Sequence, residues 1–134
     1  MNNTVNILLF VVMANLLVGG FVLITNPIRT QNRLFFIFLI LMAFWSSMVM
    51  IVLGSPSAVK AAISIRLANG VGVALALAFH FLCFSIILED NRVSNILRKS
   101  WLRVILAFPM AALAMSPWTI QSVVMPGSEG TQSV

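Results

Sequence analysis

Long apolar stretches alternate with short polar ones along the whole of this chain. The apolar stretches cover residues 5–25, 34–53, 63–88 and 101–118, and most of the charged residues lie between them. An α-helix of about 20 apolar residues is long enough to cross the hydrocarbon core of a bilayer. The pattern therefore predicts an all-α integral membrane protein with four transmembrane helices.

The connections between these stretches are short and carry turn-forming residues. Asn26-Pro27 ends the first stretch, and Pro56 follows the second. Both positions are typical of a helix end followed by a turn. Because short links make consecutive helices neighbours of opposite direction, we expect an up-down antiparallel bundle over residues 1–118. The polar residues 119–134 are expected to form a loop or tail outside the cytoplasm.

Arginine and lysine are divided unevenly between the two ends of such a bundle. Two of the eight, Lys60 and Arg66, lie toward one end, and six lie toward the other: Arg29, Arg33, Arg92, Arg98, Lys99 and Arg103. Cytoplasmic loops carry the excess of positive charge, so the pattern predicts a multi-pass protein of the cytoplasmic membrane with its N-terminus outside. The same distribution explains the net charge of +5. We therefore expect contacts with lipid headgroups and no nucleic-acid binding.

The composition excludes most catalytic functions. Hydrophobic residues make up 60% of the chain and charged residues 8%, whereas soluble domains carry about 25% charged residues. The single cysteine, Cys83, excludes an internal disulfide and a cysteine-based metal cluster. The sequence contains no metal-ligand spacing, phosphate-binding loop or catalytic triad pattern. We expect no enzyme activity, no metal and no cofactor.

His80 is the chain's single histidine, and it falls within the third apolar stretch. Ionisable groups inside a membrane are candidates for proton relays or ligand contacts. The alternative is a neutral imidazole, hydrogen-bonded to a serine or a backbone carbonyl, that sets the register of two helices. We favour this second interpretation because no carboxylate lies within an apolar stretch to complete a proton pathway.

Four further side chains are candidates for a ligand-binding or packing face. Arg66 together with Asn69 would suit an anionic ligand, although Arg66 near a helix end more often extends to the headgroups. Trp45 is a candidate for stacking on a ligand or for packing. Asn15 is a candidate for a ligand contact, but an amide in hydrocarbon more often bonds to a neighbouring helix.

The third stretch has two different sides when its residues are placed on a helical wheel. Small and polar residues gather on one side, namely Asn69, Gly72, Ala76, His80 and Cys83. Large apolar residues take the opposite side, namely Val71, Leu75, Leu82 and Ile86. Small and polar residues favour contacts between helices in a membrane, so we expect the first side to face other helices and the second to face lipid.

Several short residue patterns follow one another in the order known from one protein family. They are Asn26-Pro27, Asn32-Arg33, Leu34-Phe35, Ala43-Phe44-Trp45 and Phe79-His80-Phe81. This order resembles the N-terminal seven-helix membrane region found on many prokaryotic sensor histidine kinases and on some diguanylate cyclases. The resemblance implies the sensor, or input module, of a two-component signal-transduction protein. In that family a cytoplasmic PAS or kinase domain follows the last helix.

This chain carries four apolar stretches of the family's seven, and no phosphoacceptor or ATP-binding region. We therefore expect the front part of a sensor domain that lacks its output domain and that is completed by homodimerisation or by further C-terminal helices. An alternative is a small integral membrane subunit of a transport or assembly complex. A third possibility is a small oligomeric transporter with a pore lined by Asn69 and His80.

The predicted topology can be tested by cysteine labelling. Arg29→Cys and Arg98→Cys, each in a Cys83→Ala background, are expected to react with a membrane-impermeant maleimide in inverted vesicles and not in intact cells. Lys60→Cys is expected to show the reverse. Labelling of positions 29 and 98 from opposite sides would contradict the predicted topology.

Overall fold

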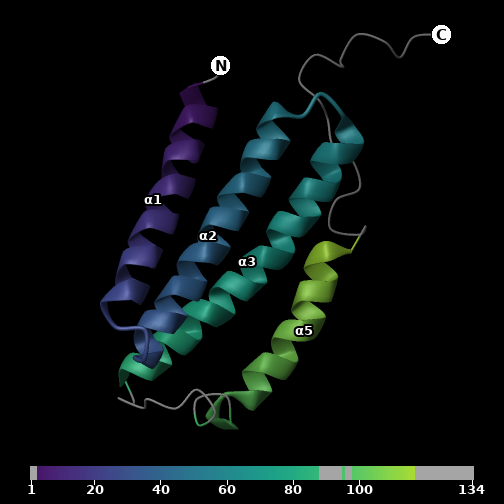
Figure 1. Ribbon diagram of the computed structural model, residues 1–134. Coiled ribbons are helices and arrows are strands. Elements are labelled where there is room, and N and C mark those ends of the chain that lie inside the picture. The colour runs from purple at the N-terminus through teal and green to yellow at the C-terminus, as the bar shows by residue number, and fades with distance from the viewer. Residues whose placement is uncertain (1–2, 88–94, 96–97, 117–134) are drawn as a thin grey trace, which may run out of the picture.

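The computed structural model describes residues 3–87, 95 and 98–116, and within them the chain is helical without a strand. Figure 1 shows the four labelled helices, α1 (Asn3–Thr25), α2 (Thr30–Gly54), α3 (Ala58–Ile87) and α5 (Trp101–Met115). The first three are long and apolar enough to cross a membrane. The prediction of a helical chain is therefore confirmed for the described residues, and α1, α2 and α3 have the length and composition that the predicted spans require.

The fourth predicted span is shorter than expected. α5 has 15 residues, which correspond to about 22 Å of helix, whereas the hydrocarbon core is about 30 Å thick. The helix ends at Met115, and Ser116 has an extended backbone. The rest of the predicted span 101–118 and the predicted tail 119–134 lie outside the described residues. That α5 is a fourth membrane-spanning helix therefore stays a prediction.

Two helices begin earlier than the hydropathy pattern predicts. α2 begins at Thr30, four residues before its apolar stretch, and α3 begins at Ala58 instead of residue 63. The carbonyl of Ser57 accepts the backbone N–H of Ala61 at 3.0 Å, which starts α3 directly after the turn. Helices extend beyond their apolar stretches because helix formation requires backbone hydrogen bonds, whereas hydropathy reports only the part that suits hydrocarbon.

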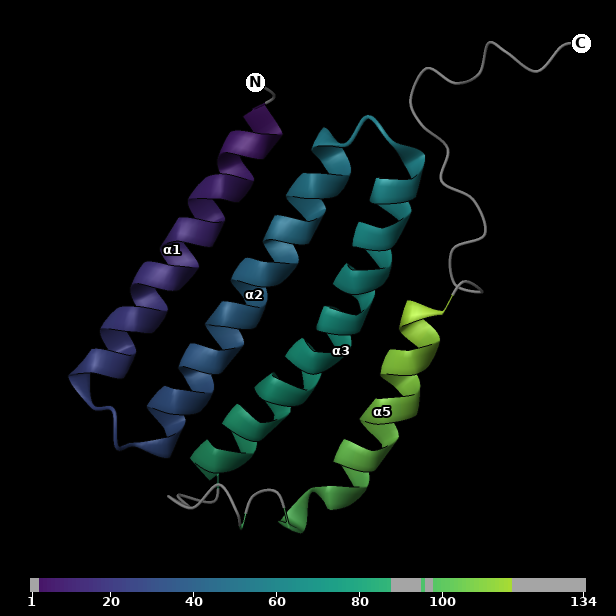
Figure 2. The same cartoon turned by 45° about the vertical axis from the view of Figure 1, so that its right-hand side comes forward.

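The helices form a single layer in sequence order. α1 packs against α2, α2 against α3, and α3 against α5, and the views of Figures 1 and 2 agree on this side-by-side order. Within the described part of the chain, α1 does not pack on α5, so the helices do not enclose a common core. The four-helix up-down bundle expected from the short links is thus not confirmed, and the main contacts join consecutive helices of the described chain.

The contact between α1 and α2 depends on a glycine. Gly19 is the buried residue of α1, and a Cβ atom at this position would lie 3.2 Å from a ring carbon of Phe36 and 3.3 Å from Cβ of Leu39. Small residues permit such a close approach of two helices in a membrane. The face of α1 that carries Gly19 therefore lies against α2.

The contact between α2 and α3 consists mainly of small side chains. The buried residues of the two helices are Thr30, Leu34, Leu39, Ala43 and Ser46 of α2 and Ala61, Ser64, Ala68, Ala78, Leu82 and Ser85 of α3. Leu34 and Leu82 form a cluster against which Phe35, Phe81 and Phe84 pack. The prediction that Leu82 faces lipid is therefore wrong. α3 has neighbours on two sides, so a single inward arc does not describe it.

The Asn-Pro turn between α1 and α2 is held by side chains of the residues that carry the family resemblance. The Oδ1 atom of Asn26 accepts the backbone N–H of Arg29 at 3.2 Å. The Nδ2 atom of Asn32 donates to the carbonyl of Val22 at 3.1 Å, and Nε of Arg33 donates to the carbonyl of Pro27 at 2.6 Å. An asparagine that binds its own backbone in this way stabilises a turn. The pattern therefore has a structural role here.

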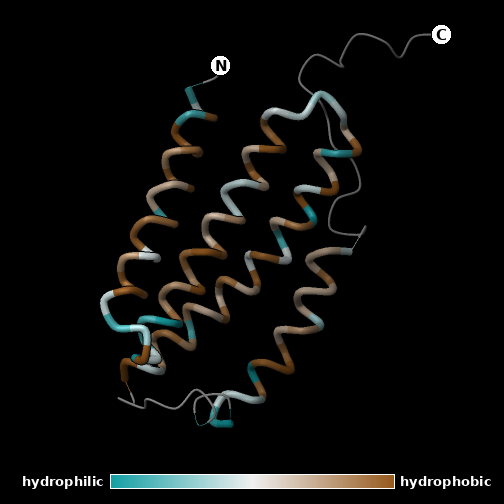
Figure 3. The backbone as a smooth tube through the Cα atoms, in the orientation of Figure 1, coloured by the Kyte–Doolittle hydropathy of each residue, from teal (hydrophilic) through white to brown (hydrophobic). Residues whose placement is uncertain are grey.

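Most of the helical surface is apolar. Figure 3 shows hydrophobic residues along the helices and hydrophilic ones mainly near their ends. On α1 alone, Phe10, Leu17, Phe21 and Ile24 are each more than two-thirds exposed. A helix that is apolar on all sides requires burial in protein or in lipid. This surface agrees with a membrane as the surrounding medium.

Gly19→Leu is expected to destabilise the chain by about 1–3 kcal/mol, the usual cost of forcing a larger side chain into a packed contact. The free energy of unfolding would be measured by titrating mixed micelles with a denaturing detergent. Gly20→Leu is the matched control, because a Cβ atom at Gly20 meets nothing within 4 Å. An equal loss of stability in the two variants would contradict the role assigned to Gly19.

Candidate functional site

A groove of about 650 Å³ runs between α3 and α5 and reaches one residue of α2. Its walls are mostly apolar, with polar groups at a few positions. The lining residues are Trp45 of α2, then Ala68, Asn69, Gly72, Val73, Ala76, Leu77 and His80 of α3, and Arg103, Leu106, Ala107, Met110 and Ala114 of α5. A volume of this size, with apolar walls and few polar groups, is typical of a small-molecule site.

The groove is open because small residues of α3 face α5 without touching it. A Cβ atom at Gly72 would meet nothing within 4 Å, and Ala76 is exposed. Of the three small residues Ala68, Gly72 and Ala76, which follow one another at four-residue spacing on α3, only Ala68 is buried, at 6% exposed. The close contact between α3 and α5 lies at one end, where Met115 lies against Gly70.

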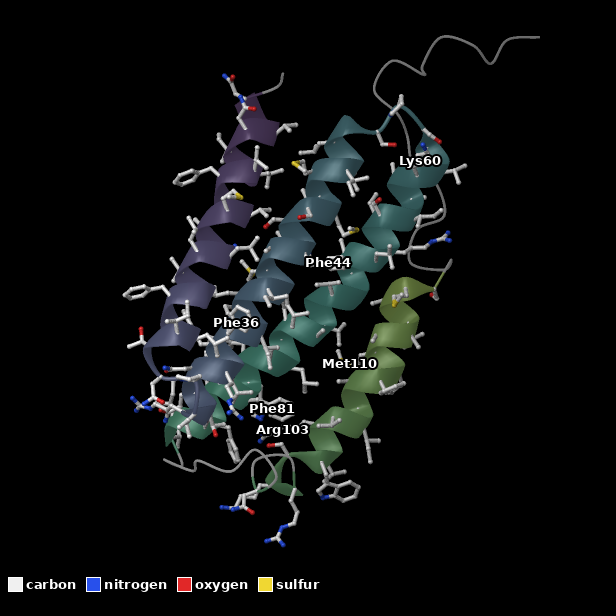
Figure 4. All side chains as sticks on the ribbon, in the orientation of Figure 1. Phe36, Phe44, Lys60, Phe81, Arg103 and Met110 are labelled. Carbon is white, nitrogen blue, oxygen red and sulfur yellow. The ribbon has the colours of Figure 1, made fainter. Side chains whose placement is uncertain are left out.

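At the other end of the groove, Arg103 of α5 donates a hydrogen bond to Nε2 of His80 on α3. Figure 4 labels Arg103 near the start of α5. A guanidinium group has only N–H donors, so Nε2 must be the acceptor and the imidazole is neutral with its proton on Nδ1. A neutral His80 agrees with the favoured interpretation of the sequence. The prediction that a serine or a backbone carbonyl is the hydrogen-bond partner of His80 is wrong, because the partner is Arg103.

The ring of Phe84 supports this pair from one side. The guanidinium carbon of Arg103 lies 5.7 Å from the centre of the Phe84 ring, and the His80 and Phe84 ring centres are 5.6 Å apart. A cation over an aromatic face gains about 0.5–2 kcal/mol, depending on how far water is excluded. One turn of α3 thus supplies both groups that hold the arginine.

The position of His80 along α3 sets its depth in a membrane. α3 has 30 residues, so its centre lies between Gly72 and Val73, and His80 is seven to eight residues away. At about 1.5 Å per residue the separation is roughly 11 Å, while half of the hydrocarbon core is about 15 Å. If the centre of α3 lies at the midplane, the Arg103–His80 pair is close to the hydrocarbon boundary, where a charged side chain reaches headgroups at low cost.

Three of the five candidate residues meet in this groove. Trp45, Asn69 and His80 line it, whereas Arg66 and Asn15 do not. Within the described part of the chain, Nε of Arg66 and Nδ2 of Asn15 have no hydrogen-bond partner. Arg66 and Asn69 therefore do not share this groove, and the expected interhelical bond is not seen for Nδ2 of Asn15.

Arg103 is the functional residue that sequence reasoning missed. The sequence shows it two residues after Trp101, inside an apolar stretch, and its charge indicates only the orientation of the chain. An arginine inside a predicted span is nevertheless a signal for a polar partner in a neighbouring helix. The sequence does not identify that partner, because the rotation of α5 about its axis decides which side chain of α3 it meets.

The described residues contain no group of three or more histidine, cysteine, aspartate or glutamate side chains that could hold a metal ion. Comparisons with protein-family models, with curated proteins and with solved structures gave no match.

The coupling between His80 and Arg103 can be measured by a double-mutant cycle of His80→Leu and Arg103→Leu. We expect a coupling of about 0.5–1.7 kcal/mol, the range measured for hydrogen bonds between membrane helices. His80→Gln is expected to retain part of it, because its side-chain oxygen also accepts a hydrogen bond. The free energy of unfolding in mixed micelles is the readout, and additive effects of the two leucine substitutions would contradict the pairing.

Proposed function

We propose that this chain is a membrane-embedded sensor module of the histidine-kinase type, which detects its stimulus within the bilayer or at its surface. The observation that carries the proposal is the groove between α3 and α5, which is open along its length and closed at one end by the Arg103–His80 hydrogen bond. A ligand in this open site would contact both α3 and α5 and could favour one arrangement of the two helices over another.

The weakness of the contact supports this interpretation. A sensor requires two states whose populations a ligand can shift by its different affinity for each. A hydrogen bond between membrane helices contributes about 0.6 kcal/mol on average and about 1.7 kcal/mol at most, so the binding energy of a small molecule is large enough to displace it. Movement of α5 along or away from α3 would then pass the signal on to an output domain.

The proposal includes the topology derived from the sequence. The helices would cross the cytoplasmic membrane in an up-down order, with the N-terminus outside and the Arg103 end of the groove toward the cytoplasm. The six basic residues at that end support this orientation, since positive charge in short loops favours the cytoplasmic side. The family resemblance of the Asn26-Pro27 turn and the Phe79-His80-Phe81 segment agrees with it.

A second candidate function is a small integral membrane subunit of a transport or assembly complex. The open layer favours it, because both faces of a single layer of helices are available to other membrane proteins. In this case the groove would receive a partner helix. Co-purification of an unrelated membrane protein in constant stoichiometry would support this function against the sensor.

The sensor proposal is tested on the native gene. We expect the reading frame to continue beyond codon 134 into a transmitter or other output domain. In that full product, Gly72→Leu, which fills the groove, is expected to change the output activity several-fold, and Gly20→Leu is expected to leave it unchanged. A stop codon directly after Val134 would count against the proposal, and so would equal activity of the two variants.

A further inference from the structure

We infer that the groove between α3 and α5 binds the acyl chain of an anionic amphiphile, with its carboxylate or phosphate head on Arg103 and its tail along the small residues of α3. This inference deepens the proposed function, on which it rests, by naming the chemical class of the ligand. Three features carry it: a positive charge at one end that no carboxylate among the described residues balances, the length of the groove and the nature of its walls.

The positive charge of Arg103 favours an anionic ligand. His80 accepts one hydrogen bond from Arg103, but a neutral imidazole does not balance a positive charge. The chain has three carboxylates, Glu89, Asp90 and Glu129, and none is among the described residues. Arg103 is exposed, and a guanidinium has five N–H donors that match the two oxygens of a carboxylate or phosphate.

The length of the groove matches one leaflet of a bilayer. Its lining on α3 extends from Ala68 to His80, which is twelve residue steps, or about 18 Å at 1.5 Å per residue. One leaflet contributes about 15 Å of hydrocarbon. A head at Arg103, near the hydrocarbon boundary, therefore places the tail along the groove to slightly beyond the membrane centre.

The walls suit a flexible hydrocarbon tail. Gly72 and Ala76 on α3 and Ala107 on α5 leave the space, and Leu106 and Met110 border it. Figure 4 shows Met110 on α5, beside the space toward α3. Methionine adapts its shape to irregular apolar surfaces. A helix of a partner protein would fill the same space, but the basic end would then have to meet an acidic residue.

The binding is measured by fluorescence quenching of Trp45, which lines the groove. Trp101→Phe and Trp118→Phe leave Trp45 as the only one of the three tryptophans. The full chain is placed in nanodiscs of zwitterionic lipid and titrated with dibrominated stearate, whose bromine atoms quench tryptophan at contact. The methyl ester of the same acid is the uncharged probe, and dibrominated phosphatidylglycerol tests whether the anion comes from a phospholipid instead of a free fatty acid.

We expect saturable quenching by at least one of the two anionic probes, with the uncharged ester at least about 10-fold weaker, because a hydrogen bond to a charged group contributes that much to affinity. Arg103→Gln is expected to reduce the affinity for the anionic probe to that of the ester. Arg98→Gln is the matched control, because Arg98 is exposed and does not line the groove. Whichever anionic probe binds more tightly identifies the source of the head group.

Filling the groove tests the position of the tail. Gly72→Leu and, as a second variant, Ala76→Phe are expected to abolish saturable quenching, and Gly20→Leu on α1 is expected to retain it. Non-saturable quenching that is equal for all probes would show ordinary bilayer lipid and overturn the inference. Loss of binding in Gly72→Leu without any effect of Arg103→Gln would also overturn it, since the occupant would then be an uncharged molecule or a helix.

The two proposals fail in different ways. Saturable, Arg103-dependent binding of an anionic amphiphile, together with unchanged output of Gly72→Leu in the full gene product, would leave the site in place and remove the sensor function. Absence of saturable binding, with an altered output in that variant, would remove the amphiphile and keep the sensor.

Discussion

Helices in a bilayer gain little from burying apolar side chains against one another, because the lipid around them is equally apolar. Contacts between helices then depend on close approach and on a few polar groups. Gly19 provides the close approach between α1 and α2, and buried serines and alanines provide it between α2 and α3. Because these contacts are individually weak, consecutive helices, which a short connection already holds together, are the ones that pack on each other.

The same constraint explains why α5 is held differently. Small residues of α3 face it along most of its length, but they leave a groove, so little close packing joins the two helices there. The Arg103–His80 pair holds one end, and Met115 against Gly70 closes the other. A helix attached at its ends is the element of this layer that can move with the least loss of contact energy. The proposed sensing role places the signal at this helix for that reason.

The residues that suggest a family need not be the residues that bind a ligand. Asn26, Asn32 and Arg33 hold the turn between α1 and α2 through hydrogen bonds to backbone atoms. Their pattern is therefore informative about how the first two helices are joined. His80, in contrast, is turned toward α5 and takes part in the groove. The resemblance thus combines a structural turn with one residue whose surroundings are suited to function.

The sequence by itself determined the helical class, the approximate bounds of α1, α2 and α3, and the apolar character that would let these helices cross a membrane, because hydropathy and turn residues act locally along the chain. It also singled out Trp45, Asn69 and His80, which meet in one groove. Only the tertiary structure decided that Leu82 is buried against α2, that Arg66 stands apart, and that Arg103 is the partner of His80. These contacts depend on the rotation of each helix about its axis. α3 carries small and polar residues on two sides, so its sequence agrees with more than one rotation.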